Sequence, residues 1–528
     1  MTRRPVVAAL LLALALVAGA CGVDLDQVPA GTTRPDGSPG TTTGATEPGT
    51  AVGAPGYHEL SAWEPCADQD DLECATLAVP LDWDEPDGET IDLLVGRKAT
   101  EGTDRIGSLL FNPGGPGEPG VDFVQDFVDN DLIPEGLDQR FDLVSWDPRG
   151  TGGSSPVECT TTEQLEAPGL DPTPDDATET QLLEADIRDS TEQCVAKYPD
   201  LIDEIGTMNT VRDLDALRAA LGDEQLSYVG YSYGTLIGEL YLKEFPAQVR
   251  AMVLDGIVLP GTEVIEETEN QLQSFEANLD AFLQDCADQR TCFGDGDPVA
   301  ALSGLIEQME GGLRIPGDYE LGGPGRQGTV GIEELYYGIV VALYSEESWS
   351  ILQQGLSQAM APEPDGGILL YLRDTYQGRD PETGEWNSSS DAFNAISCAD
   401  QPERSDTPLG DPVHVEAFAA EHPFFGALFG GGLPGCYGFP ASQEPIDEMT
   451  PGQIDDVPPV VIVSSTGDPA TPYENGAKIQ EVIDGSVLVT WEGNDHTAYR
   501  HLSDCIDEPV TTYLIDLEPP EDGLRCES

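Results

Sequence analysis

The stretch Leu226–Gly238 reads LSYVGYSYGTLIG, and two different patterns meet within it. Its first half is short, apolar and rich in β-branched and aromatic residues, which is typical of a buried strand. Its second half continues with small and apolar residues that favour a helix. The pentapeptide GYSYG, residues 230–234, lies between the two halves. The stretch therefore predicts a strand, a tight turn at Ser232 and a helix.

The pentapeptide matches G-x-S-x-G, the pattern of a nucleophilic serine on a strained strand-to-helix turn. Glycines suit such a turn because the backbone presses close on both sides, where a Cβ atom would clash. The turn would lift the Ser232 hydroxyl above the sheet, and the Tyr233 N–H would point at the space where an oxyanion forms. A chance match in a loop is the alternative, but the flanking strand and helix favour a nucleophile.

A glycine-rich loop, NPGGPGEPG at residues 112–120, follows an expected strand at residues 107–111. Its spacing and the lack of a following lysine argue against a phosphate-binding loop. A serine nucleophile on such an elbow needs a second backbone N–H from the loop after the third strand, and glycine lets the chain approach the substrate closely. We expect Gly115 to supply this N–H, with Gly114 as the near alternative.

Candidates for the acid of a Ser-His-Asp triad lie after expected buried strands. Asp468 follows the apolar run at residues 457–465, and Asp255 follows the run at residues 249–254. An acid on a surface turn is the plain alternative in so acidic a chain. We expect Asp468 to be the triad acid and keep Asp255 in reserve.

The triad base has two candidates, because only His496 and His501 follow Asp468 among the five histidines. His496 comes directly after an expected strand at residues 486–491, in the loop that should face Ser232. His501 falls in a helical stretch and is expected to be structural. The order Ser, Asp, His then gives Ser232, Asp468 and His496 as the predicted triad.

Two other segments are expected to be structural. In the loop at residues 147–154, Asp147 and Arg149 could fix a turn beside the site, although Arg149 could also meet a substrate. The segment at residues 209–217 predicts a helix with Thr210 as its N-cap, since Thr is a common capping residue.

The motifs NPGGPG, WDPRGTGGS, NTVRDLDALRAALG and GYSYGT together resemble the proline-iminopeptidase and tripeptidyl-aminopeptidase branch of the α/β-hydrolase superfamily. The likeness is strongest to secreted actinobacterial members with a TAP-like C-terminal region, and it covers nearly all of residues 57–528. It implies an α/β-hydrolase fold, a mostly parallel sheet flanked by helices, with a large cap after the sixth strand. The expected parts are a core at residues 57–259, the cap at 260–451 and the rest of the core at 452–528. TGDPATP, around Asp468, also matches the family.

The resemblance implies a serine hydrolase that works through an acyl-enzyme and needs no metal or organic cofactor. Its expected substrates are peptides with free N-termini, from which it would release tripeptides or proline. Carboxylates would then hold the substrate's ammonium group. Glu118, where the family is expected to have Gly or Ser, is a candidate, and Glu266, Glu267 and Asp400 are conceivable. A carboxylesterase with the same triad is one alternative, and a non-catalytic binding lipoprotein is another.

The charge of the chain excludes one class of partner. There are 98 Asp and Glu residues against 23 Lys and Arg, which gives a formal net charge of −75. A surface this acidic repels phosphate backbones, so nucleic acid is not expected as a partner. Peptide or ester substrates are compatible with it.

Residues 1–21 are typical of an export signal, with a short basic start and an apolar run too short to span a bilayer. Ala18-Gly19-Ala20-Cys21 resembles a bacterial lipobox, which predicts lipidation of Cys21; plain cleavage and a retained membrane helix are the alternatives. Residues 22–56 are rich in Gly, Thr and Pro and predict a disordered tether. We expect an extracellular or cell-envelope protein that meets the membrane only through the lipid at Cys21.

The cysteines predict disulfides. Setting Cys21 aside leaves ten of the 11 cysteines, an even number, which indicates disulfides in an exported chain. The sequence contains no C-x-x-C pair that would suggest a metal site instead. The connectivity cannot be read from the sequence. Pairing of near neighbours would join Cys66 with Cys74, Cys159 with Cys194, Cys286 with Cys292, Cys398 with Cys436, and Cys505 with Cys526.

Overall fold

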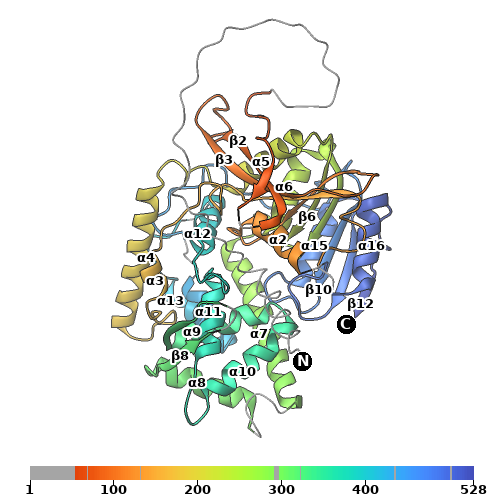
Figure 1. Ribbon diagram of the computed structural model, residues 1–528. Helices are drawn as coiled ribbons and strands as arrows, with labels where there is room; N and C mark the ends of the chain where they lie inside the picture. The colour runs from red at the N-terminus through yellow and green to blue at the C-terminus, as the bar shows by residue number, and fades with distance from the viewer. Residues whose placement is uncertain are drawn as a thin grey trace, which may run out of the picture.

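The computed structural model describes residues 54–527 except for 68, 131, 290–295, 321–322, 403, 433–435 and 500–501 (Figure 1). The expectations for the export signal, Cys21 and most of the tether lie outside the described residues, as do Cys292 and His501. Among the helices that are described, none combines the length and the apolar character needed to cross a bilayer.

The centre of the molecule is a ten-stranded sheet with the order β1-β2-β3-β5-β4-β6-β7-β10-β11-β12. The seven strands from β5 to β12 in this order run parallel, whereas β1, β2 and β3 pair antiparallel. The strands are β1 Glu64–Cys66, β2 Gln69–Pro80, β3 Thr90–Lys98, β4 Gly107–Asn112, β5 Phe141–Trp146, β6 Leu226–Tyr231, β7 Val249–Asp255, β10 Val460–Ser465, β11 Val487–Glu492 and β12 Arg525–Glu527. Central strands such as β6 are buried along their whole length, as expected of parallel strands covered on both faces.

Helices cover both faces of this sheet (Figure 1). One face packs against α2 (Gly120–Asp129) and α16 (Asp504–Asp516). The other face packs against α5 (Thr207–Ala220), α6 (Tyr233–Glu244) and α15 (Tyr473–Val482). The predicted architecture, a mostly parallel sheet flanked by helices, is therefore confirmed.

The region between β7 and β10, residues 256–459, forms a second body with its own hydrophobic core, and we call it the inserted region. Most of it lies in the lower half of Figure 1. Its elements are α7 Val264–Gln289, α8 Pro298–Glu310, β8 Ile315–Tyr319, β9 Arg326–Val330, α9 Ile332–Leu343, α10 Trp349–Ala359, α11 Gly367–Tyr376, α12 Ser389–Asp400, α13 Pro412–Glu421 and α14 Gly426–Gly432. Strands β8 and β9 form a small antiparallel sheet.

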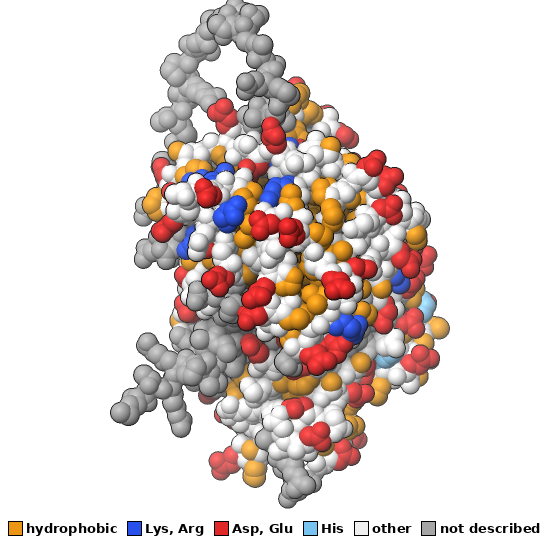
Figure 2. All heavy atoms as spheres, turned by 90° about the vertical axis from the view of Figure 1, so that its right-hand side faces the viewer, with side chains coloured by type: hydrophobic (Ala, Val, Ile, Leu, Met, Phe, Trp, Pro, Cys, Tyr) orange, Lys and Arg blue, Asp and Glu red, His pale blue; other side chains and the backbone are white. Residues whose placement is uncertain are grey.

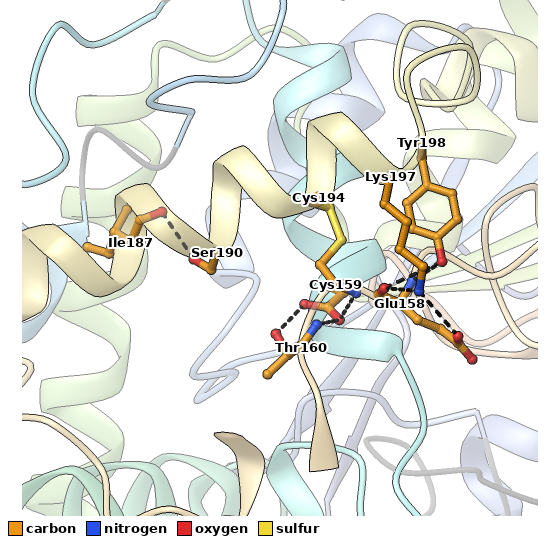
Figure 3. The surroundings of a disulfide bond; sticks show 9 residues. Glu158, Cys159, Thr160, Ile187, Ser190, Cys194, Lys197 and Tyr198 are labelled. Carbon is orange, nitrogen blue, oxygen red and sulfur yellow. Dashed lines mark hydrogen bonds and ion pairs between the residues drawn. A yellow bond between two sulfur atoms is a disulfide. The ribbon is translucent and has the colours of Figure 1, made fainter. Parts of the chain in front are cut away.

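Between β5 and α5 the chain leaves the sheet and makes α3 (Thr162–Leu165) and α4 (Ala177–Lys197). Although α4 is long, only Thr191 and Cys194 of this helix are buried. The Cys159–Cys194 disulfide joins its C-terminal end to the chain before α3, where Lys197 also bonds Glu158 (Figure 3). Covalent and polar contacts, rather than an apolar face, therefore hold this helix in place.

Four disulfides are described, and all four match the near-neighbour pairs: Cys66–Cys74, Cys159–Cys194, Cys398–Cys436 and Cys505–Cys526. Cys286 is also disulfide-bonded. Its expected partner, Cys292, lies outside the described residues.

The predicted start of α5 was wrong. The helix begins at Thr207, with Gly206 in the N-cap position and no side-chain cap of its own, so Thr210 lies inside it. Asp400, at the end of α12, accepts hydrogen bonds from the Thr207 N–H at 2.7 Å and from Thr207 Oγ1 at 2.5 Å. A carboxylate distant in sequence thus takes the place of a local cap, which the local pattern could not reveal.

Arg149 has a structural role. Its side chain is fully buried and forms a two-point ion pair with Asp213, with N–O distances of 2.7 and 2.8 Å. The same guanidinium donates to backbone carbonyls of Pro80, Leu81 and Glu204. With these contacts Arg149 joins β2 to α5 and is closed off from a substrate.

Candidate active site

Ser232 lies on the turn between β6 and α6 with φ +52° and ψ −125°, a backbone conformation that is strained for a residue with a side chain. Both glycines of the motif are required by their surroundings. A Cβ atom on Gly230 would lie 2.3 Å from the Gly234 carbonyl oxygen, and one on Gly234 would lie 2.7 Å from the Asn112 carbonyl oxygen. The Ser232 N–H donates to the Asp255 carbonyl at 2.8 Å, which fixes the turn against the end of β7.

Asp468 and His496 lie in contact in the loops that follow β10 and β11. The distances from His496 Nδ1 to the two carboxylate oxygens are 2.9 and 3.0 Å. Both residues are buried, with 2% and 7% of their surface exposed. Because a carboxylate only accepts, Nδ1 carries the proton of the neutral ring and Nε2 is left as the acceptor. This is the arrangement a general base requires.

Asp468 is itself held in place by three donors. The backbone N–H groups of Ala470 and Thr471 donate to Oδ1 at 2.9 and 2.8 Å, and Thr471 Oγ1 donates to Oδ2 at 2.7 Å. Thr471 Oγ1 also lies 3.3 Å from His496 Nδ1. Thr471 therefore contacts both members of the pair, and sequence reasoning had not singled it out.

The loop that carries His496 and the turn that carries Ser232 are both attached to Asp255. Its carboxylate Oδ2 accepts hydrogen bonds from the N–H groups of Ala498 at 2.9 Å and Tyr499 at 2.7 Å. Tyr231 directly precedes Ser232 in the chain, and its hydroxyl donates to the Tyr499 carbonyl at 2.7 Å. Within the described residues no hydrogen bond joins the Ser232 hydroxyl to His496. Such bonds between catalytic groups are often long before substrate binds.

Asp255, the reserve candidate for the triad acid, makes no hydrogen bond to the His496 ring. It is fully buried and bonds the backbone beyond His496, whereas the His496 ring nitrogen contacts Asp468. Burial raises the pKa of Asp255 to about 7. Its structural role could not be read from the sequence, where it is one more acid after a buried strand.

The glycine-rich loop after β4 lies directly against the turn. A Cβ atom on Gly114 would lie 2.9 Å from Ser232 Cβ and 3.1 Å from the Tyr233 nitrogen. The Gly114 N–H donates to Asn112 Oδ1 at 3.0 Å. By contrast, the N–H groups of Gly115 and Tyr233 have no hydrogen-bond partner among the described residues, and Gly115 is exposed. An oxygen that reached these two N–H groups would therefore displace no existing hydrogen bond.

The Tyr233 side chain points away into a buried network. Its hydroxyl forms a hydrogen bond with Thr207 Oγ1, which also bonds Asp400. Desolvation raises the pKa of Asp400 to about 7. Asp400 is therefore engaged at the start of α5.

The other candidate acids lie in two places. Glu118 is half-buried, and its Oε2 accepts a hydrogen bond of 3.3 Å from Ser389 Oγ of α12. The neighbouring Gly117 packs against the same helix, since a Cβ atom there would lie 2.5 Å from the Ser389 carbonyl oxygen. Glu266 and Glu267 are exposed in the first turn of α7.

The inserted region reaches the histidine through Tyr344, just after α9. The Tyr344 carbonyl accepts the His496 N–H at 2.9 Å, and the two rings meet edge to face with centroids 5.2 Å apart. No sequence signal distinguished this tyrosine from the other 15.

Comparisons with known proteins agree with this geometry. A family model described as the alpha/beta hydrolase fold matches residues 107–499, so the chain belongs to the α/β-hydrolase fold family. It is 36% identical over 484 residues to serine protease Hip1 of Mycobacterium tuberculosis, covering 88% of this chain and 90% of that protein. It is 34% identical over 505 residues to carboxylesterase B of the same organism, with 92% and 94% covered.

A tripeptidyl aminopeptidase of Streptomyces lividans is 29% identical over 481 residues, with 88% of this chain and 86% of that protein covered. The predicted relationship to tripeptidyl aminopeptidases within the α/β-hydrolases is therefore confirmed. The chain is an enzyme, a serine hydrolase of the peptidase or esterase kind.

Proposed function

We propose that the chain is an aminopeptidase in which Ser232 is the nucleophile, His496 the general base and Asp468 the residue that orients it. The observation that carries this proposal is the Asp468–His496 pair, whose histidine loop is attached through Asp255 to the turn of a strained serine. The residue types and their order match the triad of acyl-transfer enzymes.

The reaction would begin when the Ser232 hydroxyl attacks the substrate carbonyl carbon and His496 Nε2 takes its proton. The oxygen that becomes negative would accept hydrogen bonds from the N–H groups of Gly115 and Tyr233. His496 would then give the proton to the leaving amine, and an acyl-enzyme would remain on Ser232. Water, activated by the same histidine, would release the acyl group and restore the serine.

Peptides with free N-termini are the proposed substrates, and the proposed products are short peptides or proline released from those N-termini. The relatives named serine protease and tripeptidyl aminopeptidase support peptide hydrolysis. Figure 2 shows Asp and Glu side chains spread over one face of the molecule, with few Lys and Arg. Such a field favours a cationic substrate end over an anionic one. Glu118, three residues beyond Gly115, is the proposed partner of the substrate ammonium group.

We further propose that residues 260–451 act as a cap over the site, between core parts at residues 57–259 and 452–528. Tyr344 from this region contacts His496, as a cap that shapes a substrate pocket would. Residues 1–21 are proposed as an export signal with lipidation at Cys21, followed by a tether. The disulfides support an oxidising, extracellular or cell-envelope location.

The test uses the purified domain from Tyr57 onward with a fluorophosphonate probe, followed by aminocoumarin amides of Ala-Ala-Pro, of acetyl-blocked Ala-Ala-Pro and of Pro. We expect the probe to label wild type but not Ser232→Ala, and cleavage of unblocked peptides only. Labelling with turnover of blocked and free peptides alike would contradict an aminopeptidase. No labelling of wild type would contradict the whole assignment.

A carboxylesterase is the second candidate, favoured by the relative of that name at 34% identity. Ester and amide hydrolysis share the same triad, so the fold does not separate them. Turnover of a short p-nitrophenyl ester without turnover of any peptide amide would replace the first proposal with this one.

A further inference from the structure

One buried side chain of the inserted region contacts both loops of the Asp468–His496 pair. Asn278, in the middle of α7, is 2% exposed. Its Nδ2 donates to the Gly467 carbonyl at 2.8 Å and to the Asn494 carbonyl at 3.1 Å. Gly467 directly precedes Asp468, and Asn494 lies two residues before His496. One amide group therefore bridges the two loops, alongside the direct backbone hydrogen bond of 2.9 Å from the Gly467 N–H to the Gly493 carbonyl.

Other side chains of the inserted region touch only one of these loops. Gln271, two turns earlier on α7, donates to the Ala470 carbonyl at 2.9 Å, in the acid loop. Ser345 Oγ donates to Asp495 Oδ1 at 2.9 Å, in the histidine loop. Asn278, by contrast, donates hydrogen bonds to both loops at once, and this distinguishes a bridge from a simple anchor.

An asparagine is unexpected on the buried, apolar face of α7 unless its amide group makes hydrogen bonds there. The same face of α7 buries apolar side chains, including Leu272, Phe275, Leu279 and Phe282. Asn278 Oδ1 is buried without a hydrogen-bond partner among the described residues, which destabilises the fold relative to an apolar side chain. The two donated bonds are what the fold gains from an asparagine here.

We propose that Asn278 is a positioning residue that fixes the Asp468–His496 geometry from the inserted region. This inference rests on the proposed function, in which His496 is the base. If the two loops move apart, Asp468 holds the imidazolium less well, so both the rate of chemistry and the apparent pKa of the base change. The inserted region would then take part in catalysis as well as in substrate choice.

The principal variant is Asn278→Leu, which removes both donated hydrogen bonds without adding a charge and suits the apolar face of α7. We expect kcat to fall by about 10-fold to 100-fold with KM within about twofold, as for other small displacements of catalytic groups. The acidic limb of the kcat/KM profile should move to lower pH, because a looser pair stabilises the imidazolium less.

The matched control is Gln271→Ala, which removes an anchor on the same helix without touching the histidine loop. We expect it to keep kcat within about twofold and the wild-type pH profile. Asn278→Ala, which also removes the amide without adding a charge, decides the matter if Asn278→Leu does not fold. Both Asn278 variants are compared at temperatures well below their unfolding midpoints.

The outcomes separate the two proposals. If the fluorophosphonate labels wild type, and Asn278→Leu and Asn278→Ala both keep the wild-type kcat and pH profile, the positioning role alone is overturned. An equal loss in Gln271→Ala would also overturn it, because any anchor would then suffice. Wild type that is not labelled would overturn the proposed function itself.

Discussion

Asp255 accepts a hydrogen bond of 2.7 Å from the backbone N–H of Tyr499, three residues beyond His496. The same residue, through its carbonyl, accepts the N–H of Ser232 at 2.8 Å. A single position at the end of β7 thus holds the turn of the nucleophile and the loop of the base. It does so without a hydrogen bond to the His496 ring.

Replacement of Asp255 tests this link. Asp255→Leu would leave the N–H groups of Ala498 and Tyr499 buried without an acceptor, which destabilises the fold by about 2–4 kcal/mol. We expect activity to fall with it, since the histidine loop loses its attachment. Asp255→Asn keeps one acceptor oxygen and is expected to retain most of both. Denaturant unfolding and peptide turnover measure the two effects, and equal behaviour of the two variants would contradict this role.

Thr471→Val removes the hydroxyl that donates to Asp468 Oδ2 while keeping the shape of the side chain. One hydrogen bond is worth about 1 kcal/mol, so kcat should fall about fivefold if that bond orients the carboxylate. Thr471→Ser keeps the hydroxyl and is expected to keep near wild-type kcat. Steady-state kinetics decides the point; a valine variant as active as the serine variant would show that the two backbone donors suffice.

Glu239 on α6 is fully buried, and neither of its carboxylate oxygens has a partner among the described residues. Burial raises its pKa well above the usual range. The folded protein therefore keeps a proton that the unfolded chain loses near pH 4.3, at about its usual pKa, and the free energy of unfolding falls as the pH rises above that value.

We expect Glu239→Gln to raise the free energy of unfolding by about 1–3 kcal/mol at pH 8 and to leave it nearly unchanged at pH 4. Glu244→Gln, at the exposed end of the same helix, is the matched control and should change it by no more than about 0.5 kcal/mol. Urea unfolding at the two pH values provides the measurement. A gain of equal size at both would disprove the titration of Glu239.

The Arg149–Asp213 pair is buried at both ends, with an N–O distance of 2.7 Å. Arg149→Met leaves the Asp213 carboxylate buried and without its cation, which destabilises such sites by about 3–5 kcal/mol. The double variant Arg149→Met, Asp213→Leu removes both charges and is expected to be less destabilised than the sum of the single variants. Denaturant unfolding of all four proteins gives the coupling, and simple additivity would count against a specific pair.

The strands and the strained turn could be predicted because they depend on local patterns. β6 and β10 are short, largely apolar runs, and the close approach of neighbouring atoms requires the glycines around Ser232. The loops of Asp468 and His496 follow neighbouring parallel strands, so strand order alone places them at one edge of the sheet. Their catalytic roles remain predictions.

The rest depends on contacts between residues far apart in the chain. Asp400 replaces the expected cap at the start of α5, and no residue near Thr207 in the sequence indicates that it does so. Asn278 lies within a helix and Tyr344 just after one, both are common residue types there, and only the folded chain shows that they contact the histidine loop. Long-range polar contacts of this kind leave no periodic signal in a single sequence.

The pairing of β7 with β10 has a consequence for how the chain is made. Val253 lies opposite Val461, yet all of residues 256–459 must be synthesised between these two strands. Until β10 arrives, one side of the apolar β7 is an open edge, the kind of surface on which other chains assemble into aggregates. A ribosome-bound or truncated chain that stops before β10 therefore exposes this strand edge. We expect it to aggregate more readily than the chain in which the last strands are complete.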